Sequence, residues 1–266
     1  RYLRRGEYPS EARTMMRMGA GMLAILAPLQ LLFGDLHGLN TLEHQPVKVA
    51  AMEGHWEDTG PAPVVIFGIP DEERETNRAE IAIPKLGSLI LTHEWDGRYP
   101  GLKDFPPEER PPVTIVFYAF RVMVILGVAL IFLGLAGAYL WWRGRLFDTP
   151  WYLRLADRSW WIGFVAILAG WITTESGRQP YIVQGLLRTA DAVSPVSAYA
   201  VATSLAAFVV VYCVVFTIGI HYIRVLMRRG PTGAALEPPP APEGLPNRPL
   251  SAAQDSAHES VREAAP

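Results

Sequence analysis

Four long apolar blocks, separated by polar segments, set the pattern of this sequence. The blocks cover about residues 15–33, 113–142, 160–174 and 196–222. A helix needs about 20 apolar residues to cross the hydrocarbon core of a bilayer, and the second and fourth blocks exceed this length. Their residues do not alternate with the period of two that is typical of strands in a membrane barrel. The pattern predicts an all-α integral membrane protein with four transmembrane helices.

The segments around these blocks complete a predicted order of four regions. Residues 1–33 form a lead and the first transmembrane helix, and residues 34–112 form a large loop. Residues 113–229 contain the other three helices. Residues 230–266 are rich in Pro, Ala and Ser and lack apolar periodicity, which predicts a disordered tail.

Basic residues near the ends of the blocks predict the orientation in the membrane. Short segments rich in Lys and Arg tend to remain in the cytoplasm. Both termini and the link after the second block are therefore predicted to be cytoplasmic, which leaves the large loop extracytoplasmic. The residues on which this prediction depends are Arg1, Arg4, Arg5, Arg13, Arg17, Arg143, Arg145, Arg154, Arg158, Arg224, Arg228 and Arg229.

The composition narrows the class of protein further. Half of the residues (50%) are hydrophobic and 19% are charged. A chain with this composition is too apolar to be disordered throughout. A net charge of −2 gives no reason to expect a nucleic-acid partner. A single cysteine, Cys213, excludes a disulfide scaffold and leaves no zinc pattern. The loop histidines are therefore expected to be ordinary loop residues: His37, His44, His55 and His93.

Charged residues at the end of the third block are candidates for chemistry. Trp171, Glu175 and Arg178 are spaced four and three apart, so they share one face if the helix continues that far. An ionisable group in a membrane helix is costly unless it has a partner or a function. One interpretation is a structural ion pair between Glu175 and Arg178. The other is a carboxylate that binds a metal or moves a proton, with Arg178 holding an anionic cofactor group.

A second candidate lies in the second block, where Arg121 and Met123 are two residues apart. Methionine in an apolar helix usually serves packing. A thioether can also be an axial ligand of haem iron, and a nearby arginine can pair with a propionate. The spacing alone leaves both interpretations open.

The large loop begins with a predicted short helix. Gln45-Pro46 is typical of a helix start, and a helix over residues 46–55 puts Lys48 and Met52 on one face. Glu53 then lies about 140° around the axis from Lys48. These residues either line a pocket or belong to a solvated amphipathic helix on the membrane surface, and the sequence favours the second interpretation.

Four segments together resemble subunit I of the cytochrome bd-type quinol oxidases. They are GDLHGLNTLEHQPVKVAAMEGHW at 34–56, FGIPDEERETN at 67–77, FRVM at 120–123 and GWITTESGRQP at 170–180. Their order and separation match the family as well. The resemblance covers about residues 1–230, and the short loop is similar to that of the cyanide-insensitive branch.

The resemblance implies roles for the loop residues. The loop corresponds to the family's quinol-binding Q-loop, with Lys48 and Glu53 at the positions of quinol oxidation. Asp35 matches a position near the low-spin haem.

The resemblance also implies haem-binding residues in the helices. Met123 corresponds to the axial ligand of the low-spin haem b iron, and Arg121 to the arginine that stabilises its reduced form. Glu175 corresponds to the ligand of the high-spin haem b iron, and Trp171 to a tryptophan between the haems. Arg178 belongs to the GRQP motif beside the haem cluster. Tyr181 stands where the family usually has Trp.

The implied activity is that of a terminal respiratory oxidase in the bacterial inner membrane. Such an enzyme oxidises quinol on the outer side and reduces O2 to water with two haems b and a third haem, d or b, which generates proton motive force. The implied partners are oxidase subunit II, a small single-helix subunit and the N-terminal half of subunit I. The four helices match the last four of nine in the family, so the chain is expected to be a C-terminal portion that is inactive alone.

Two other classes remain open from the residues themselves. One is a non-catalytic membrane scaffold or transporter segment in which Glu175 and Arg178 form a structural pair. The other is a fragment that does not fold. Bound haem distinguishes the oxidase from both.

Overall fold

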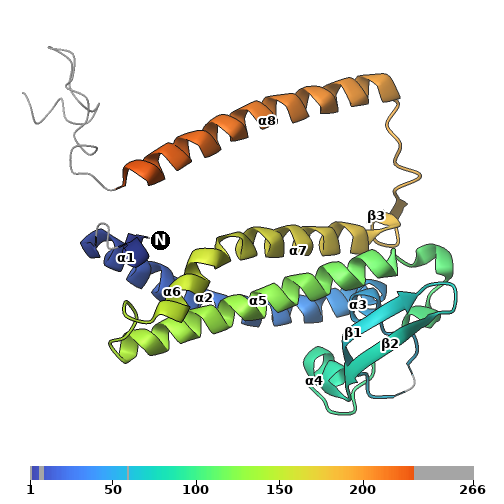
Figure 1. Cartoon of the computed structure of the whole chain (residues 1–266). Coiled ribbons are helices and arrows are strands. Elements are labelled where there is room, and N and C mark those ends of the chain that lie inside the picture. Colours follow the sequence, from blue (N-terminus) through green and yellow to red (C-terminus); the bar gives the residue numbers. More distant parts are fainter. Residues whose placement is uncertain (1, 6–8, 59, 231–266) are drawn as a thin grey trace, which may run out of the picture. The chain divides into compact units, whose positions relative to one another are not determined.

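The computed structural model describes residues 2–5, 9–58 and 60–230, and Figure 1 shows its elements along the chain. The chain divides into two units, one within Arg1–Val196 and the other beginning at Ser197. The predicted disordered tail at 230–266 lies outside the described residues except for Gly230.

Long helices dominate both units. The first unit contains α2 (Pro9–His44), α5 (Val113–Trp142) and α7 (Ile162–Arg178), and the second contains α8 (Ala198–Arg229). Among the described residues, three helices are long and apolar enough to cross a membrane: Ser10–His44, Val113–Trp142 and Ala198–Arg229. Helix α7 has 17 residues, at the lower limit for a span. The structure therefore supports three of the four predicted transmembrane helices by length and composition.

Shorter elements connect the long helices. They are α1 (Tyr2–Arg5), α3 (Pro46–Glu53), β1 (Val64–Asp71), β2 (Thr76–Ile83), α4 (Leu86–Thr92), η1 (Leu102–Asp104), η2 (Pro107–Glu109), α6 (Pro150–Arg158), η3 (Ser159–Trp161), β3 (Tyr181–Val183) and β4 (Leu187–Arg188). Figure 1 shows α3, α4 and the β1–β2 hairpin at the end of the first unit where α5 begins.

The prediction of an all-α fold is wrong in the connection between α2 and α5 (residues 45–112). Strands β1 and β2 pair antiparallel there, from Val64 opposite Ile83 to Asp71 opposite Thr76. Their sequences are rich in β-branched residues, which favour strands, and a charged turn joins them. A second, very short hairpin joins β3 to β4 after α7.

Helix α2 extends eleven residues beyond the end of the first apolar block. Its helical hydrogen bonding continues through Thr41, whose hydroxyl donates to the His37 carbonyl at 2.8 Å. It ends at His44 because Gln45 precedes a proline, and residues before proline disfavour helical backbone. His37 and His44 therefore lie on a helix, and the prediction that they are loop residues is wrong.

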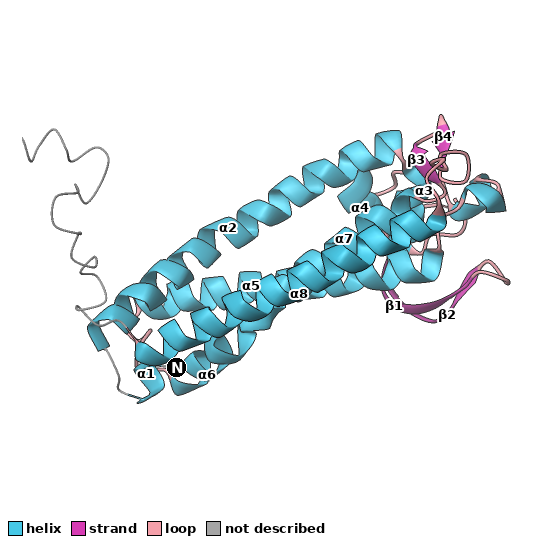
Figure 2. Ribbon diagram, turned by 90° about the horizontal axis from the view of Figure 1, so that it is seen from above, coloured by secondary structure: helices cyan, strands magenta, loops and turns pink. Residues whose placement is uncertain are grey.

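Helix α5 is the centre of the first unit and packs against both α2 and α7. Figure 2 shows these helices running along the same direction. At Gly134 a Cβ would lie 2.8 Å from the backbone nitrogen of Ala24, so α5 approaches the backbone of α2 where a side chain is missing. Small residues allow this close approach of membrane helices.

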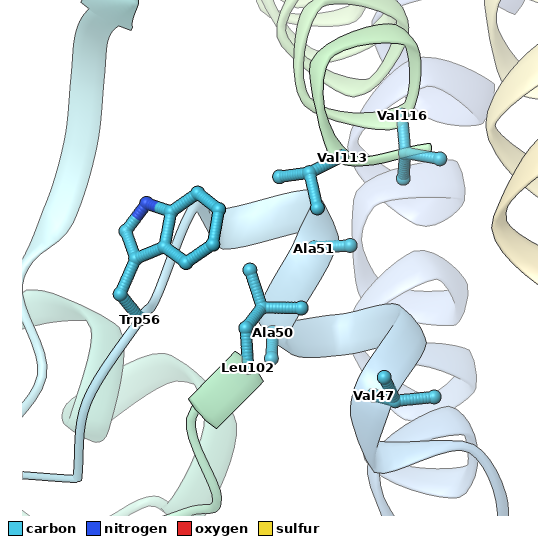
Figure 3. Close-up of a cluster of buried hydrophobic side chains, with 7 residues drawn as sticks. All are labelled: Val47, Ala50, Ala51, Trp56, Leu102, Val113 and Val116. Carbon is cyan, nitrogen blue, oxygen red and sulfur yellow. The ribbon is translucent and has the colours of Figure 1, made fainter. Parts of the chain in front are cut away.

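A buried apolar cluster attaches α3 to the beginning of α5. Figure 3 shows its members: Val47, Ala50, Ala51, Trp56, Leu102, Val113 and Val116. The side chains are between 0% and 7% exposed. The interpretation of α3 as a solvated amphipathic helix is therefore wrong, because α3 is packed against α2, α5 and α7.

The β1–β2 hairpin is joined to the end of α3 through Asn77. The Trp56 indole donates to Asn77 Oδ1 at 2.9 Å, and Asn77 Nδ2 donates to the Gly54 carbonyl at 2.8 Å. Gly54 caps α3 with a left-handed backbone, φ 63°. These contacts hold the residues after α3 in place.

Helix α8 forms the described part of the second unit. The Ser197 hydroxyl caps its start by accepting from the Ala200 amide at 3.3 Å. None of its residues is buried within the described chain. A 32-residue apolar helix of this kind requires lipid or protein around it.

Candidate functional site

The centre of the candidate site is a buried ion pair between α3 and α5. Arg121 Nη2 donates to Glu53 Oε2 at 3.0 Å, and each side chain is 11% exposed. Glu53 is the last residue of α3, and Arg121 lies two turns into α5. The structure thus brings together two residues that the sequence singled out separately.

Arg121 also holds three backbone segments together. Its Nε donates to the Val65 carbonyl at 2.6 Å, and its Nη1 donates to the Met52 carbonyl at 2.8 Å. Its guanidinium lies over the Phe117 ring at 4.4 Å from the centroid. With β1, α3 and α5 all in contact, the guanidinium is fixed in direction.

Burial and the arginine act in opposite directions on Glu53. Burial raises the pKa of the Glu53 carboxyl, and the charge and hydrogen bond of Arg121 lower it less. The net effect is that the pKa of Glu53 is raised. Glu53 Oε2 is bound to Arg121, whereas Oε1 has no hydrogen-bond donor among the described residues. A proton can therefore be accepted at Oε1 while Arg121 holds the other oxygen.

Lys48 lies on another side of α3 and faces α7. A Cβ on Gly177 would lie 3.0 Å from Lys48 Cγ, so the lysine stem passes directly over that glycine. Burial lowers the pKa of the Lys48 ammonium, Arg178 lowers it further, and Glu175 raises it. The predicted separation of Lys48 from Glu53 around α3 agrees with these different neighbours.

Asp35, which was predicted to lie in the loop, lies on helix α2 and away from the Glu53–Arg121 pair. On α2, its Oδ2 is 3.4 Å from His93 Nε2, and the two side chains are 32% and 59% exposed. No described contact joins Asp35 to Glu53 or Arg121.

The other predicted cofactor residues lie on the facing sides of α5 and α7 and on the outer face of α7. Met123 is half-buried, and a Cβ on Gly170 would lie 3.0 Å from its sulfur. Trp171 is 63% exposed, and Glu175 is exposed one turn further on. The ion pairs within residues 9–58 and 60–230 do not include Glu175 with Arg178. The interpretation of a structural pair between them is therefore not supported by the geometry.

These positions are compatible with bound haem. The Met123 sulfur packs closely on Gly170, and a thioether and a carboxylate are both able to ligate iron. The face of α7 that contains Glu175 also exposes apolar side chains at Phe164, Leu168 and Trp171. A planar apolar group with a metal at its centre suits such a face.

Two further residues belong to the site, although the sequence did not single them out as functional. His55 and Tyr99 are buried, 9% and 3% exposed, and their ring centroids are 4.6 Å apart. His55 lies in the loop after α3, as predicted, but it is buried rather than solvated. Nothing in the local sequence singles out Tyr99, which lies 44 residues further along the chain.

A mostly helical membrane protein with a buried acid–arginine pair at one end of its helices is the class that this geometry defines. The family model for "Cytochrome bd terminal oxidase subunit I" matches residues 1–231. The chain belongs to this family, and the resemblance found in the sequence is confirmed at that level.

Characterised relatives agree with this assignment. "Cytochrome bd ubiquinol oxidase subunit 1" from Bacillus subtilis (strain 168) is 38% identical over 194 residues, which are 69% of this chain and 42% of that protein. "Cytochrome bd-II ubiquinol oxidase subunit 1" from Escherichia coli (strain K12) is 28% identical over 311 residues, covering 91% of this chain and 60% of that protein. The chain therefore spans about half the length of these relatives.

A solved structure supports the fold as well. The bd oxidase from Geobacillus thermodenitrificans superimposes with a TM-score of 0.69 at 32% sequence identity. The match covers 86% of this chain and 52% of that chain.

Proposed function

We propose that this chain is part of a terminal oxidase that oxidises quinol on the outer side of the bacterial inner membrane and reduces O2 to water. It would contribute the quinol-binding loop and part of the haem ligation, and the reaction would generate proton motive force. The observation that carries the proposal is the buried Glu53–Arg121 pair, two residues along α5 from Met123. Membership of the subunit I family supports it.

Glu53 is proposed as the base that receives a quinol proton. Oxidation of a quinol releases two protons with two electrons, so the site requires a proton acceptor. A raised pKa suits a carboxylate for this role near neutral pH, and Oε1 is the atom without a donor. Lys48, with its lowered pKa, is proposed to donate a hydrogen bond to the quinol oxygen.

The haem-binding roles are proposed from the positions of the side chains. Met123 would bind the low-spin haem b iron and Glu175 the high-spin haem b iron, with Trp171 and Arg178 beside them. When bound, these haems and a third haem, d or b, would supply electron transfer and oxygen chemistry. Asp35 is proposed to lie near the low-spin haem.

The topology and partners belong to the same proposal. Helix α7 would be a fourth transmembrane helix, both termini would be cytoplasmic, and the α2–α5 connection would be periplasmic. The exposed apolar surface of α8 supports the presence of neighbours, which we propose to be subunit II, a small single-helix subunit and the rest of the subunit I fold. The short α2–α5 connection is proposed to be that of the short-loop branch.

The test is a reduced-minus-oxidised absorbance spectrum together with quinol-driven O2 uptake, on the complex isolated from its native membrane. Glu175→Ala and Met123→Leu should each remove a haem b signal and lower O2 uptake. Met22→Leu makes the same change as Met123→Leu on an exposed face of α2 and should keep both. Wild-type spectra in Glu175→Ala and Met123→Leu would overturn the ligand roles, and a complex without haem would overturn the oxidase.

A further inference from the structure

Two buried polar atoms beside the ion pair have no partner. His55 Nε2 and the Tyr99 hydroxyl are both closed to solvent, and neither has a hydrogen bond within the described residues. Their rings lie 4.6 Å apart at an angle of 45°. Folded proteins rarely leave buried polar atoms unpaired, and such atoms often have a functional reason. Two of them in contact point to a site that handles protons or water.

The buried ion pair influences the Tyr99 hydroxyl electrostatically. Burial raises the pKa of the Tyr99 hydroxyl, the charge of Glu53 raises it further, and Arg121 lowers it. Tyr99 thus lies within electrostatic range of the buried pair. It also contacts the His55 ring, and His55 follows Glu53 by two residues, so both rings lie close to the end of α3.

Three solvated carboxylates lie within electrostatic range of His55. Burial lowers the pKa of His55, while the Tyr99 backbone and the carboxylates of Asp58, Asp104 and Glu80 raise it. These three carboxylates are exposed. His55 is therefore a buried group that exposed carboxylates influence.

We propose that Tyr99 and His55 form a proton relay from Glu53 to the aqueous phase outside, which rests on the proposed quinol oxidation at Glu53. The Tyr99 hydroxyl accepts the proton from the Glu53 carboxyl and passes its own proton to His55 Nε2. Each transfer needs a bridging water or a reorientation of the side chain, because neither polar atom has a hydrogen bond within the described residues. The imidazolium then releases one proton to water near Asp58, Asp104 and Glu80. Each step moves one proton between an acid and a base, and the two electrons leave the quinol separately.

A direct contact with quinol is the competing role for these residues. It fits the geometry less well, because both polar atoms lie beneath the surface and a quinol ring needs an open approach. A proton needs only a hydroxyl and an imidazole that reorient, or one water between them.

The test uses the complete oxidase complex and the variant Tyr99→Phe. This change removes an atom without a partner, so it should leave assembly, haem spectra and the KM for a short-chain quinol unchanged. The relay predicts that kcat falls at least about tenfold, with a larger solvent deuterium isotope effect on turnover. Tyr152→Phe is the matched control, because it removes a buried hydroxyl that donates to the Leu133 carbonyl at 3.2 Å, far along α5 from Glu53. It should keep the wild-type kcat and isotope effect.

A second variant, His55→Gln, tests the outer half of the relay. It should lower kcat as Tyr99→Phe does and change the pH profile of kcat, with KM again unchanged. Wild-type kcat in Tyr99→Phe would overturn the relay, and so would a raised KM at unchanged kcat, which indicates quinol contact. If His55→Gln does not assemble, Tyr99→Phe decides alone. A wild-type complex that does not oxidise quinol would instead overturn the proposed function, whatever the variants do.

Discussion

Two acid–arginine combinations lie near the same end of the first unit, and their geometries are opposite. Glu53 and Arg121 are buried and joined at 3.0 Å between α3 and α5. Glu175 and Arg178 are three residues apart on α7, yet Glu175 is exposed and the described ion pairs do not join them. Their sequence spacing would have favoured the second combination as the ion pair. Close spacing on a helix allows a contact, but packing of distant segments decides whether a charged pair forms.

The difference assigns separate tasks to the two carboxylates. Glu53 has its charge compensated within the chain, so it can stay buried and exchange protons. Glu175 is exposed and has no ion pair among the described residues, so it is available to a group that covers α7. Lys48 lies close to both sets, since Arg178 and Glu175 both act on its pKa.

The largest expected effect comes from breaking the buried pair. Arg121→Leu leaves the Glu53 carboxylate and three backbone carbonyls (Val65, Met52 and Glu53) without the arginine donor, which should cost about 3–5 kcal/mol of stability. Arg178→Leu makes the same change beside Glu175, where no ion pair is lost, and should cost much less. Thermal unfolding of the purified complex measures both, and equal midpoints would mean that the two combinations do not differ.

A smaller effect is expected at Gly177, where Lys48 crosses α7. In Gly177→Ala the new Cβ would lie 3.0 Å from Lys48 Cγ and 3.1 Å from Cε, so the lysine must shift. If Lys48 contacts quinol, we expect a loss of about 1 kcal/mol in binding, roughly a fivefold rise in KM. Gly163→Ala is the control on the same helix, because nothing lies within 4 Å of its new Cβ. Equal KM values in the two variants would mean that Lys48 does not contribute to quinol binding.

The sequence pattern predicts the long helices well because their signal is local. Twenty or more apolar residues in a row leave few alternatives to a membrane helix. Helix α7, with 17 residues and a polar end, lies at the limit of that signal. The β1–β2 hairpin was missed because eight-residue strands are far shorter than a membrane span, so a pattern of long apolar blocks passes over them. The extension of α2 to His44 was missed because residues 34–44 are polar, although Pro46 marks its end.

The sequence predicted the arrangement of the site only where the residues lie on one helix, because helix geometry then fixes their relative directions. Residues five apart on a helix lie about 140° around the axis, and Lys48 and Glu53 do face different neighbours. The contact of Glu53 with Arg121 joins residues 68 apart, and no local pattern gives it. His55 and Tyr99 are likewise 44 residues apart, and both become buried only through the packing of the α2–α5 connection.

The smallest expected effect is a pH dependence of stability that belongs to Glu53 alone. Its pKa in the folded chain is raised above the ordinary value of 4.5, so between these two values the folded state binds more protons than the unfolded state. The contribution of Glu53 to the free energy of unfolding is therefore fully present below pH 4.5. It is lost as the pH rises through the pKa that Glu53 has in the folded chain. Glu53→Gln should remove this part of the decline and keep a hydrogen bond to Arg121.

The measurement is the thermal midpoint of the complex from pH 4 upward, compared between wild type and Glu53→Gln. Glu73→Gln makes the same chemical change at the exposed hairpin turn, and the wild-type decline should persist there. A Glu53→Gln complex that declines as steeply as wild type would mean that Arg121 outweighs burial, so that Glu53 remains charged throughout. Glu53 would then be a structural partner of Arg121, and the proton acceptor for quinol would have to be another group near Lys48.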